Sequence, residues 1–338
     1  MKIALYVAES SPTSTSTSGD GTKTEIFNTY DLSQTITSVE WKLTMLDQPG
    51  ELNFSYRTAP NVKLTTGSNV VLQVDGVTRF NGFIFQVGET EGPVGTVKVY
   101  DRMRYLQAKD SFTFNGESLS VMFEKICKLK GLPYTVRWGP DRGLPAHVFD
   151  NVSLADMLSW GVDQTLALDN NLYVIYDDCG TLVLDNVRAL DTDLLFGDGL
   201  ALTGWDFGKS IDEATYNVIK LVRDATDDQQ REVVVKSDTG TVSRWGQLQY
   251  FEKVKEDFSV SQMNDRAVKL LSLYNRETWT LTLTTIGVAR VIAGNGVGIR
   301  IGALDKEGFG CGITTFVQSV HHQIEGEKYT MSLELAVP

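Results

Sequence analysis

Cysteine is scarce in this sequence. The three thiols, in Cys127, Cys179 and Cys311, are far apart and odd in number. Neither a disulfide framework nor the close ligand spacing of a zinc site can be drawn from them. Because cysteine packs readily as a small hydrophobic residue, we predict that these thiols are free and buried or half-buried.

Histidine is equally scarce, with three residues in the whole chain. None of His147, His321 and His322 lies in a His-Glu-x-x-His or nucleophile-elbow pattern. His321 and His322 are neighbours on a predicted strand, so their side chains point to opposite faces, which disfavours joint metal ligation. We therefore predict no catalytic, cofactor-binding or metal-binding residue, no cofactor, and a protein that is not an enzyme.

The sequence also lacks a basic stripe and a long apolar run. Its net charge is −12, shared as about −2 over residues 1–110, −6 over 111–195 and −4 over 196–338. Binding to phosphates requires clustered Lys and Arg, so we predict no sequence-specific nucleic-acid contact. No apolar run reaches the roughly 18–20 residues of a membrane span. The short apolar start, Met1–Ala8, lacks a cleavage site, so we interpret it as a strand and predict no membrane anchor.

The first third of the chain has the alternation of half-buried strands. Val39–Met45 alternates between apolar and polar residues. Asn69–Val74 leads into Asp75-Gly76, a hairpin signal because glycine supplies the positive φ of a tight turn. The return strand Val77–Val87 is predicted to break at Asn81-Gly82, where glycine weakens a strand.

A low-complexity Ser/Thr-rich stretch precedes these strands at residues 10–21. Its composition predicts a solvated loop between two strands, a common place for partner contacts. Gly19–Lys23 lacks the spacing of a phosphate-binding loop and is more simply a hairpin tip.

The middle third shows helical spacing. Ser118 can cap one helix, and Ser153 with Asp156 predicts the capping box of a second. A hairpin with Asp177-Asp178-Cys179-Gly180 in its turn follows. The predicted apolar helix faces are Leu119, Met122, Phe123, Ile126 and Cys127, then Leu154, Met157, Leu158 and Val162.

The last third returns to strands, interrupted by one helix. Ser259 and Gln262 predict another capping box. The chain closes on the alternating run Tyr329–Val337. The other predicted segments are strands at Val218–Val222 and Glu232–Lys236 and a hairpin-like stretch around Trp245–Lys255.

The two ends of the chain repeat one order of strands. The matched segments are Trp41–Met45 with Trp279–Leu283, Gly67–Val74 with Gly294–Ile301, Phe80–Val87 with Phe309–Gln318, and the closing strands Thr96–Tyr100 with Tyr329–Leu335. We therefore predict a mainly β protein with α+β insertions, holding two tube-like β-barrel domains and a small α+β middle domain. The predicted boundaries are 1–107 for the first barrel, 108–195 for the middle domain, 196–258 for a β-rich connecting region open to packing with the second barrel, and 259–338 for a helix plus that barrel.

The ordered set of segments resembles the XkdQ/YqbQ-type tail proteins of defective and temperate phages of Gram-positive bacteria. The resemblance covers roughly residues 35–338 and is carried by the stretches Val70–Gly76, Phe80–Gly82, Val97–Leu106, Asp110–Phe112, Leu172–Leu184 and His321–Leu335. It implies a trimeric baseplate hub related to the myophage central hub and to the body of type VI secretion spike proteins. Such a trimer carries six similar barrels and adapts a sixfold tube to a threefold spike.

The resemblance also implies partners and a location. These are a homotrimer, the tail tube protein, a separate central spike protein, the tape-measure protein and baseplate wedge proteins, in the tail baseplate of a virion or in a tailocin assembled in the bacterial cytoplasm. The family has no catalytic residues to carry over to this sequence.

Three other interpretations stay open. Gly294–Gly298 superficially resembles a dinucleotide-binding loop, but a predicted strand follows where a phosphate site needs a helix N-terminus. Asp177 and Asp178 are the candidate acid pair of a tail-associated cell-wall hydrolase, although such carboxylates act from opposite sides of a cleft. A tail-tube or adhesin-type β protein is the third, but a plain tube subunit needs one barrel.

Overall fold

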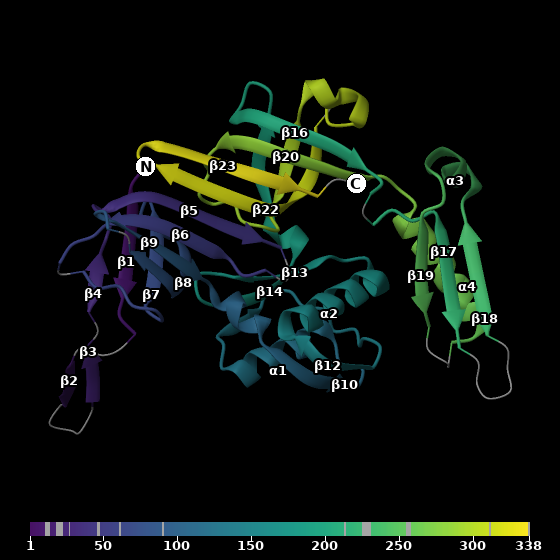
Figure 1. Cartoon of the computed structure of the whole chain (residues 1–338), viewed down its shortest axis with the longest axis horizontal. Helices are drawn as coiled ribbons and strands as arrows, with labels where there is room; N and C mark the ends of the chain where they lie inside the picture. Colours follow the sequence, from purple (N-terminus) through teal and green to yellow (C-terminus); the bar gives the residue numbers. More distant parts are fainter. Residues whose placement is uncertain are drawn as a thin grey trace. The chain divides into compact units, whose positions relative to one another are not determined.

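The computed structural model describes residues 1–10, 14–17, 23–26, 28–45, 48–60, 62–89, 91–212, 214–224, 231–254, 258–310 and 312–336. Cys311, Val337 and residues 19–22 of the predicted hairpin tip lie outside the described residues. The chain forms two compact units, Met1–Trp205 with Thr282–Val337, and Asp206–Leu281. Strands β16 and β20 connect them (Figure 1).

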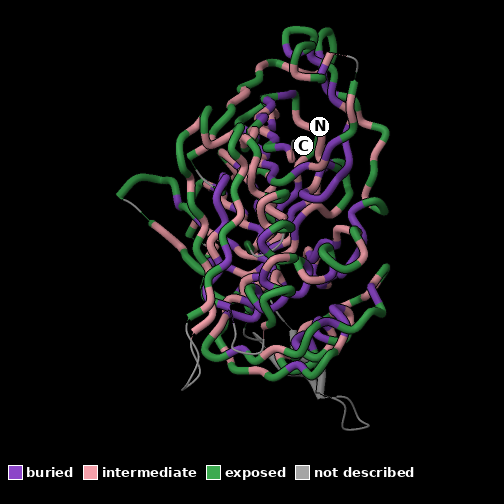
Figure 2. The backbone as a smooth tube through the Cα atoms, turned by 90° about the vertical axis from the view of Figure 1, so that its right-hand side faces the viewer, coloured by how far each residue is buried: buried purple, intermediate pink, exposed green. Residues whose placement is uncertain are grey.

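The first β module lies in the first third of the chain. Its strands follow the spatial order β5-β6-β9-β8-β7-β1, with β4 on the far side of β1. Along β6 and β7, buried residues alternate with half-buried ones, which gives the sheet one core face and one more exposed face. Figure 2 colours the backbone by this burial. The bounds are β1 Ile3–Ala8, β4 Thr29–Asp31, β5 Ile36–Thr44, β6 Glu51–Arg57, β7 Asn69–Val74, β8 Val77–Glu89 and β9 Val94–Tyr100.

The second β module repeats this arrangement near the C-terminus. Its strands follow the spatial order β16-β20-β23-β22-β21-β15, and both orders also run in the same sequence along the chain. One pair differs, since β15 and β21 are parallel and β1 and β7 antiparallel. The bounds are β15 Asp191–Gly197, β16 Leu202–Ser210, β20 Thr278–Ile286, β21 Gly296–Arg300, β22 Ile313–Glu325 and β23 Lys328–Leu335, with the short helix η3 Gly302–Glu307 between β21 and β22.

Backbone hydrogen bonds fix the correspondence of the two modules residue by residue. Gly67 N–H donates to the Ile84 carbonyl and Gly294 N–H to the Val317 carbonyl, both at 2.8 Å. Both glycines have positive φ, 83° and 91°. One residue later along each strand a β-bulge interrupts the ladder, at Phe85 in β8 and at Gln318 in β22. The structure therefore confirms the predicted repeat and makes Phe85 the counterpart of Gln318.

The predicted pairing of the tryptophan strands was wrong. Trp41 lies on β5 and Trp279 on β20, but the strand order makes β16 the counterpart of β5, and β6 the counterpart of β20. The predicted match of Phe80–Val87 with Phe309–Gln318 was likewise two residues out of register at its end, since the counterpart of Gln318 is Phe85 and not Val87. Short alternating strands look alike in sequence, so only the ladder fixes their order.

The middle domain has its own hydrophobic core. Helices α1 and α2 are capped by Ser118 and Ser153, as predicted, and the nine predicted core residues of their faces are all buried. Strand β14 pairs with β13 and, in parallel, with β11, while β10 pairs with β12. The bounds are η1 Arg102–Gln107, β10 Lys109–Phe114, α1 Leu119–Lys130, β11 Tyr134–Val136, β12 His147–Ser153, α2 Leu154–Asp169, β13 Tyr173–Asp177, β14 Leu182–Asn186 and η2 Val187–Leu190.

The unit Asp206–Leu281 is an insertion between β16 and β20 of the second module. Its core places Met263 and Ala267 of α4 against Ile219 and Leu221 of β17, so the helix predicted to begin the second barrel shares a core with the predicted connecting region. Ser259 and Gln262 form the predicted capping box. The bounds are β17 Val218–Arg223, β18 Glu232–Ser237, α3 Thr239–Trp245, β19 Gln249–Lys253 and α4 Val260–Tyr274.

Three local predictions were wrong. The described part of the predicted hairpin, residues 245–254, forms no hairpin, because Asp238 caps the helix α3 and β19 then pairs in parallel with β17; Lys255 lies outside the described residues. Strand β8 runs unbroken through Gly82. A glycine is required at this position because a Cβ there would lie 2.4 Å from the Tyr100 carbonyl oxygen. Within the Ser/Thr-rich stretch, β2 (Ser14–Thr17) pairs with β3 (Lys23–Ile26) instead of forming a continuous loop.

Candidate functional surface: the joint between the modules and its polar face

The two modules join edge to edge through main-chain pairing. The second half of β22, Ser319–Glu325, runs antiparallel to Ser38–Thr44 of β5. The same half of β22 pairs with β23 on its other side, so a single thirteen-stranded sheet extends across both modules (Figure 1). We call this pairing the module joint.

The core side of the module joint is an aromatic stack. The Trp41 and His322 rings lie 4.2 Å apart and nearly parallel, and Trp41 is 1% exposed. His322 Nε2 lies 3.0 Å from the Val291 carbonyl oxygen and its Nδ1 lies 2.9 Å from the Tyr329 hydroxyl. A carbonyl only accepts, so Nε2 carries the proton and Nδ1 accepts from Tyr329. Burial lowers the pKa of His322 to about 3, which keeps the ring neutral.

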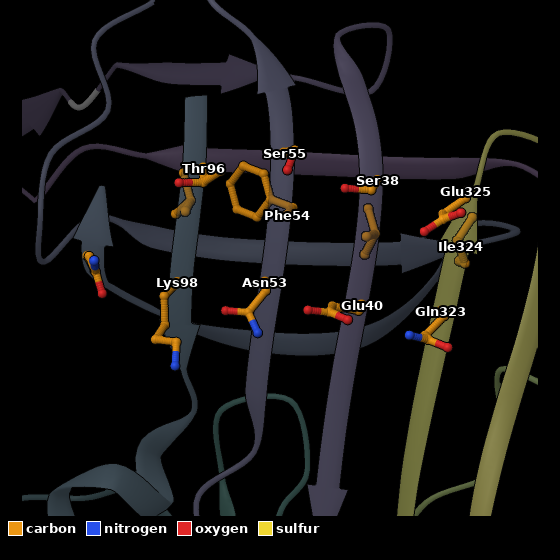
Figure 3. Close-up of a pocket in the computed structure, with 13 residues that line it drawn as sticks. Ser38, Glu40, Asn53, Phe54, Ser55, Thr96, Lys98, Gln323, Ile324 and Glu325 are labelled. Atoms are coloured by element: carbon orange, nitrogen blue, oxygen red, sulfur yellow. The ribbon is translucent and has the colours of Figure 1, made fainter. Parts of the chain in front are cut away.

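The opposite side of the module joint is a polar concave surface. Side chains of β5, β6, β8, β9 and β22 line a hollow of about 410 Å³ that crosses from one module to the other (Figure 3). We call it the polar face. Its polar lining residues are Ser38, Glu40, Asn53, Ser55, Gln86, Thr96, Lys98, Gln323 and Glu325.

The charge on this side of the sheet is mixed with an acidic excess. Lys98 pairs with Glu51 at 2.9 Å, and His321 Nε2 lies 3.2 Å from a Glu40 oxygen. Burial of Glu51 opposes ionisation, but hydrogen bonds from Asn53 and Lys98 outweigh it and lower the Glu51 pKa. Glu325 lies opposite Ser38 across the module joint and opposite Lys328 on the other side, in β23. A surface of hydroxyls, amides and carboxylates offers little neutralisation to a phosphate backbone.

Within the described ranges the outer edges of β4 and β15 lack a partner, and so do two further strand segments of the sheet, which bear on the module joint. Strand β16 pairs with β20 alone. Residues Gln86–Glu89 of β8 pair with β9 but not with β7. By the correspondence of the modules, β16 is the counterpart of β5, and Gln86–Glu89 is the counterpart of the start of the β22 half that pairs with β5. The two open edges therefore match the two edges that form the module joint.

Asp177 and Asp178, the candidate hydrolase pair, both make structural contacts. Asp177 accepts from the backbone N–H groups of Arg102 and Gly180, and Asp178 pairs with the Arg137 guanidinium. Burial and the neighbouring Asp177 raise the pKa of Asp101, and burial also raises that of Asp177. Asp101 in turn accepts from the N–H groups of Gly50 and Met103. Asp101, Asp177 and Asp178 line one hollow of about 170 Å³. Within it, Asp101 and Asp177 are held by backbone N–H groups and Asp178 by Arg137.

The other residues singled out in the sequence are dispersed. Cys127 is buried and Cys179 half-buried, and both are free, as predicted. His321 and His322 face opposite sides of β22, as predicted. His147 packs against Trp160 in the middle domain, and Gly294–Gly298 leads into strand β21. Within the described ranges no cluster of His, Cys, Asp or Glu could hold a metal ion, and no helix is long and apolar enough to span a membrane.

Sequence reasoning missed the features that define this surface. The bulge at Phe85, the pairing of β22 with β5 and the open edges leave no motif in the sequence. The polar positions of β5 do alternate with apolar ones, and this signal located that strand without showing which strands lie beside it. Strand β6 was not predicted.

Comparison with known proteins assigns the fold. Residues 39–336 match the profile of the YqbQ-like family. The chain belongs to the YqbQ-like family. It is 24% identical to the uncharacterized protein YqbQ of Bacillus subtilis over 275 residues, and 24% identical to the phage-like element PBSX protein XkdQ of the same organism over 281 residues. Each match covers 80% of this chain and 82% of the relative.

A solved structure with the same fold is the 43 kDa tail protein of prophage MuSo2 from Shewanella oneidensis. It superimposes with a TM-score of 0.67 at 12% identity, covering 99% of this chain and 98% of the other. The YqbQ-like chain therefore shares a fold with a phage tail protein over its whole length, including the inserted unit.

Proposed function

We propose that this chain is the structural hub of the baseplate of a contractile tail, in a phage or a tailocin. Three copies form a ring that adapts the sixfold tail tube to the threefold central spike. The observation that carries the proposal is the match between the module joint and the two open strand edges. If β16 of one copy pairs with Gln86–Glu89 of the next, the joint inside each chain is repeated between chains.

The ring has six similar positions because each of three copies contributes two modules. A closed cyclic assembly pairs the open edges of β16 and of Gln86–Glu89 in every copy, which removes two sites of uncontrolled strand pairing. The proposed neighbours of the ring are the tail tube protein, a separate spike protein, the tape-measure protein and the baseplate wedge proteins. The proposed location is the tail baseplate of the particle, assembled in the host cytoplasm.

The polar face forms the wall of the channel in this proposal. Its hydroxyl, amide and carboxylate groups outnumber the lysine of the lining, Lys98, which is itself paired with Glu51. The face therefore offers little neutralisation to a passing polyanion. The role is mechanical, without a cofactor or a catalytic step. The occupied state of Asp177 and Asp178 supports this, as does the likeness of the fold to a tail protein.

Blocking the β16 edge is expected to weaken the trimer. The Ala201 carbonyl accepts from Ile286 N–H on β20, so the N–H groups of Leu202 and Gly204, at alternate positions, point to the open side. Gly204→Pro removes an edge donor without breaking the ladder to β20. We expect a trimer dissociation constant at least about tenfold higher, the equivalent of roughly 1.4 kcal/mol, measured by sedimentation equilibrium.

Gly204→Ala is the matched control, because it keeps the N–H and its Cβ has no neighbour nearer than 3.9 Å. It should assemble like the unmodified chain. An unmodified chain that stays monomeric at high concentration, alone and with its tube and spike proteins, would contradict the proposed hub.

A further inference from the structure

A group of aromatic and arginine side chains surrounds the bulge in β8. The Phe85 ring lies 5.3 Å from that of Tyr100 and 6.2 Å from that of Tyr105, between ring centroids. The Arg104 guanidinium lies 5.5 Å from the Phe85 ring centre and 5.9 Å from that of Tyr100. We call Phe85, Tyr100, Arg104 and Tyr105 the Phe85 cluster. Its members contact one another within a single chain.

The Phe85 cluster is open to solvent although it is largely aromatic. Phe85 is 38% exposed and Tyr105 40% exposed. Tyr and Arg are enriched among the residues that dominate binding energy at protein interfaces, and rigid rings lose little entropy on binding. The composition is therefore that of a contact surface.

The second module has no such cluster at the corresponding place. Gln318 stands where Phe85 stands, and Ala336 stands where Tyr100 stands, since the Ala336 N–H donates to the Phe316 carbonyl as the counterpart of the Phe83–Tyr100 pair. The aromatic surface thus belongs to the first module alone. In a ring of alternating modules it occurs once per chain.

The module joint shows which segment lies beside this position. In the second module the chain leaving β5 bonds to the main chain of the bulged residue, because Met45 N–H donates to the Gln318 carbonyl at 2.8 Å, while the Gln318 side chain stays exposed. The counterpart of β5 is β16, and the chain leaving β16 enters the inserted unit. By this correspondence, the chain that leaves β16 in a neighbouring copy would lie beside Phe85.

We propose that the Phe85 cluster is the docking site for a second copy of this chain, at the segment that follows β16 and begins the inserted unit. The inference rests on the proposed trimer and names its contact. A single six-residue connection follows β5, whereas the inserted unit follows β16. The joint between chains therefore includes a segment that has no counterpart in the joint within the chain. The aromatic cluster supplies the matching surface on the first module.

The test replaces the aromatic residue by the residue that the other module carries. Phe85→Gln puts at the bulge a side chain that the same backbone tolerates at Gln318, so the fold is retained. We expect a trimer dissociation constant at least about tenfold higher, in line with the loss of an interface hot spot. Val77→Gln is the control, because Val77 is an exposed residue, 49% exposed, at the other end of the same strand.

Crosslinking identifies the occupant. A photoreactive benzoylphenylalanine at position 85 should join two copies, and mass spectrometry should locate the product in residues 206–281 of the other copy. A product within one chain, or with a different protein, overturns the proposal. So does an unchanged dissociation constant for Phe85→Gln in a chain that trimerises. A chain that never trimerises overturns the hub itself, which separates the two failures.

Discussion

Trp41→Ala is expected to lower the free energy of unfolding of the two-module unit by about 3–5 kcal/mol, the usual cost of removing a fully buried large aromatic side chain. Trp41 is 1% exposed and stacks on His322 from the other module. Its loss leaves a cavity at the module joint and removes a partner from both modules. Urea unfolding followed by circular dichroism measures the change.

The location of the damage is as specific as its size. Amide hydrogen exchange should accelerate first in Val39–Leu43 and Val320–Ile324, the two strands of the module joint, because local opening follows the weakened contacts. Trp138→Ala is the control, since Trp138 is 61% exposed and its truncation leaves no cavity. Equal losses of stability in the two variants would show that the stack is not what holds the modules together.

Low pH is expected to destabilise the module joint. The pKa of His322 in the folded chain is about 3, against an ordinary value of 6.5. A lowered pKa means that the unfolded chain binds the proton more readily. The stabilisation is therefore complete above pH 6.5 and is lost as the pH falls from 6.5 towards 3. The full loss is on the order of 5 kcal/mol.

His322→Gln isolates this contribution, because an amide does not titrate. Unfolding free energies measured at a series of pH values should fall less steeply between pH 6 and 4 in the variant, by the equivalent of one proton. Asp101 and Asp177 have raised pKa values, so their protonation favours the folded chain at low pH and opposes the trend. They are present in both proteins and cancel in the difference. Parallel profiles would mean that His322 is not the titrating group.

The local elements were predictable and their arrangement was not. Ser118 and Ser153 identify their helices because a cap is a contact between residues three apart. Asp75-Gly76 identifies its hairpin for the same reason. The pairing of Ser319–Glu325 with Ser38–Thr44 joins residues nearly 300 positions apart, and no short-range pattern carries it.

The candidate surface divides in the same way. Its polar positions are visible as alternation in Val39–Met45, but the hollow they line exists only because strands from both ends of the chain lie together. The repeat was the exception, since Gly67 and Gly294 need the same positive φ and so left the same mark in two places. The two glycines begin the matched segments Gly67–Val74 and Gly294–Ile301, so this part of the repeat could be found in the sequence.

The insertion between β16 and β20 has a consequence for how such chains diversify. The two strands are antiparallel neighbours, so the chain leaves and re-enters the module at adjacent points. Material of any length spliced there costs the module little beyond the entropy of closing a longer loop, which rises only slowly with length. In the first module the corresponding connection, between β5 and β6, is six residues long. The second module thus carries a whole extra domain at a place where the first has only a short connection.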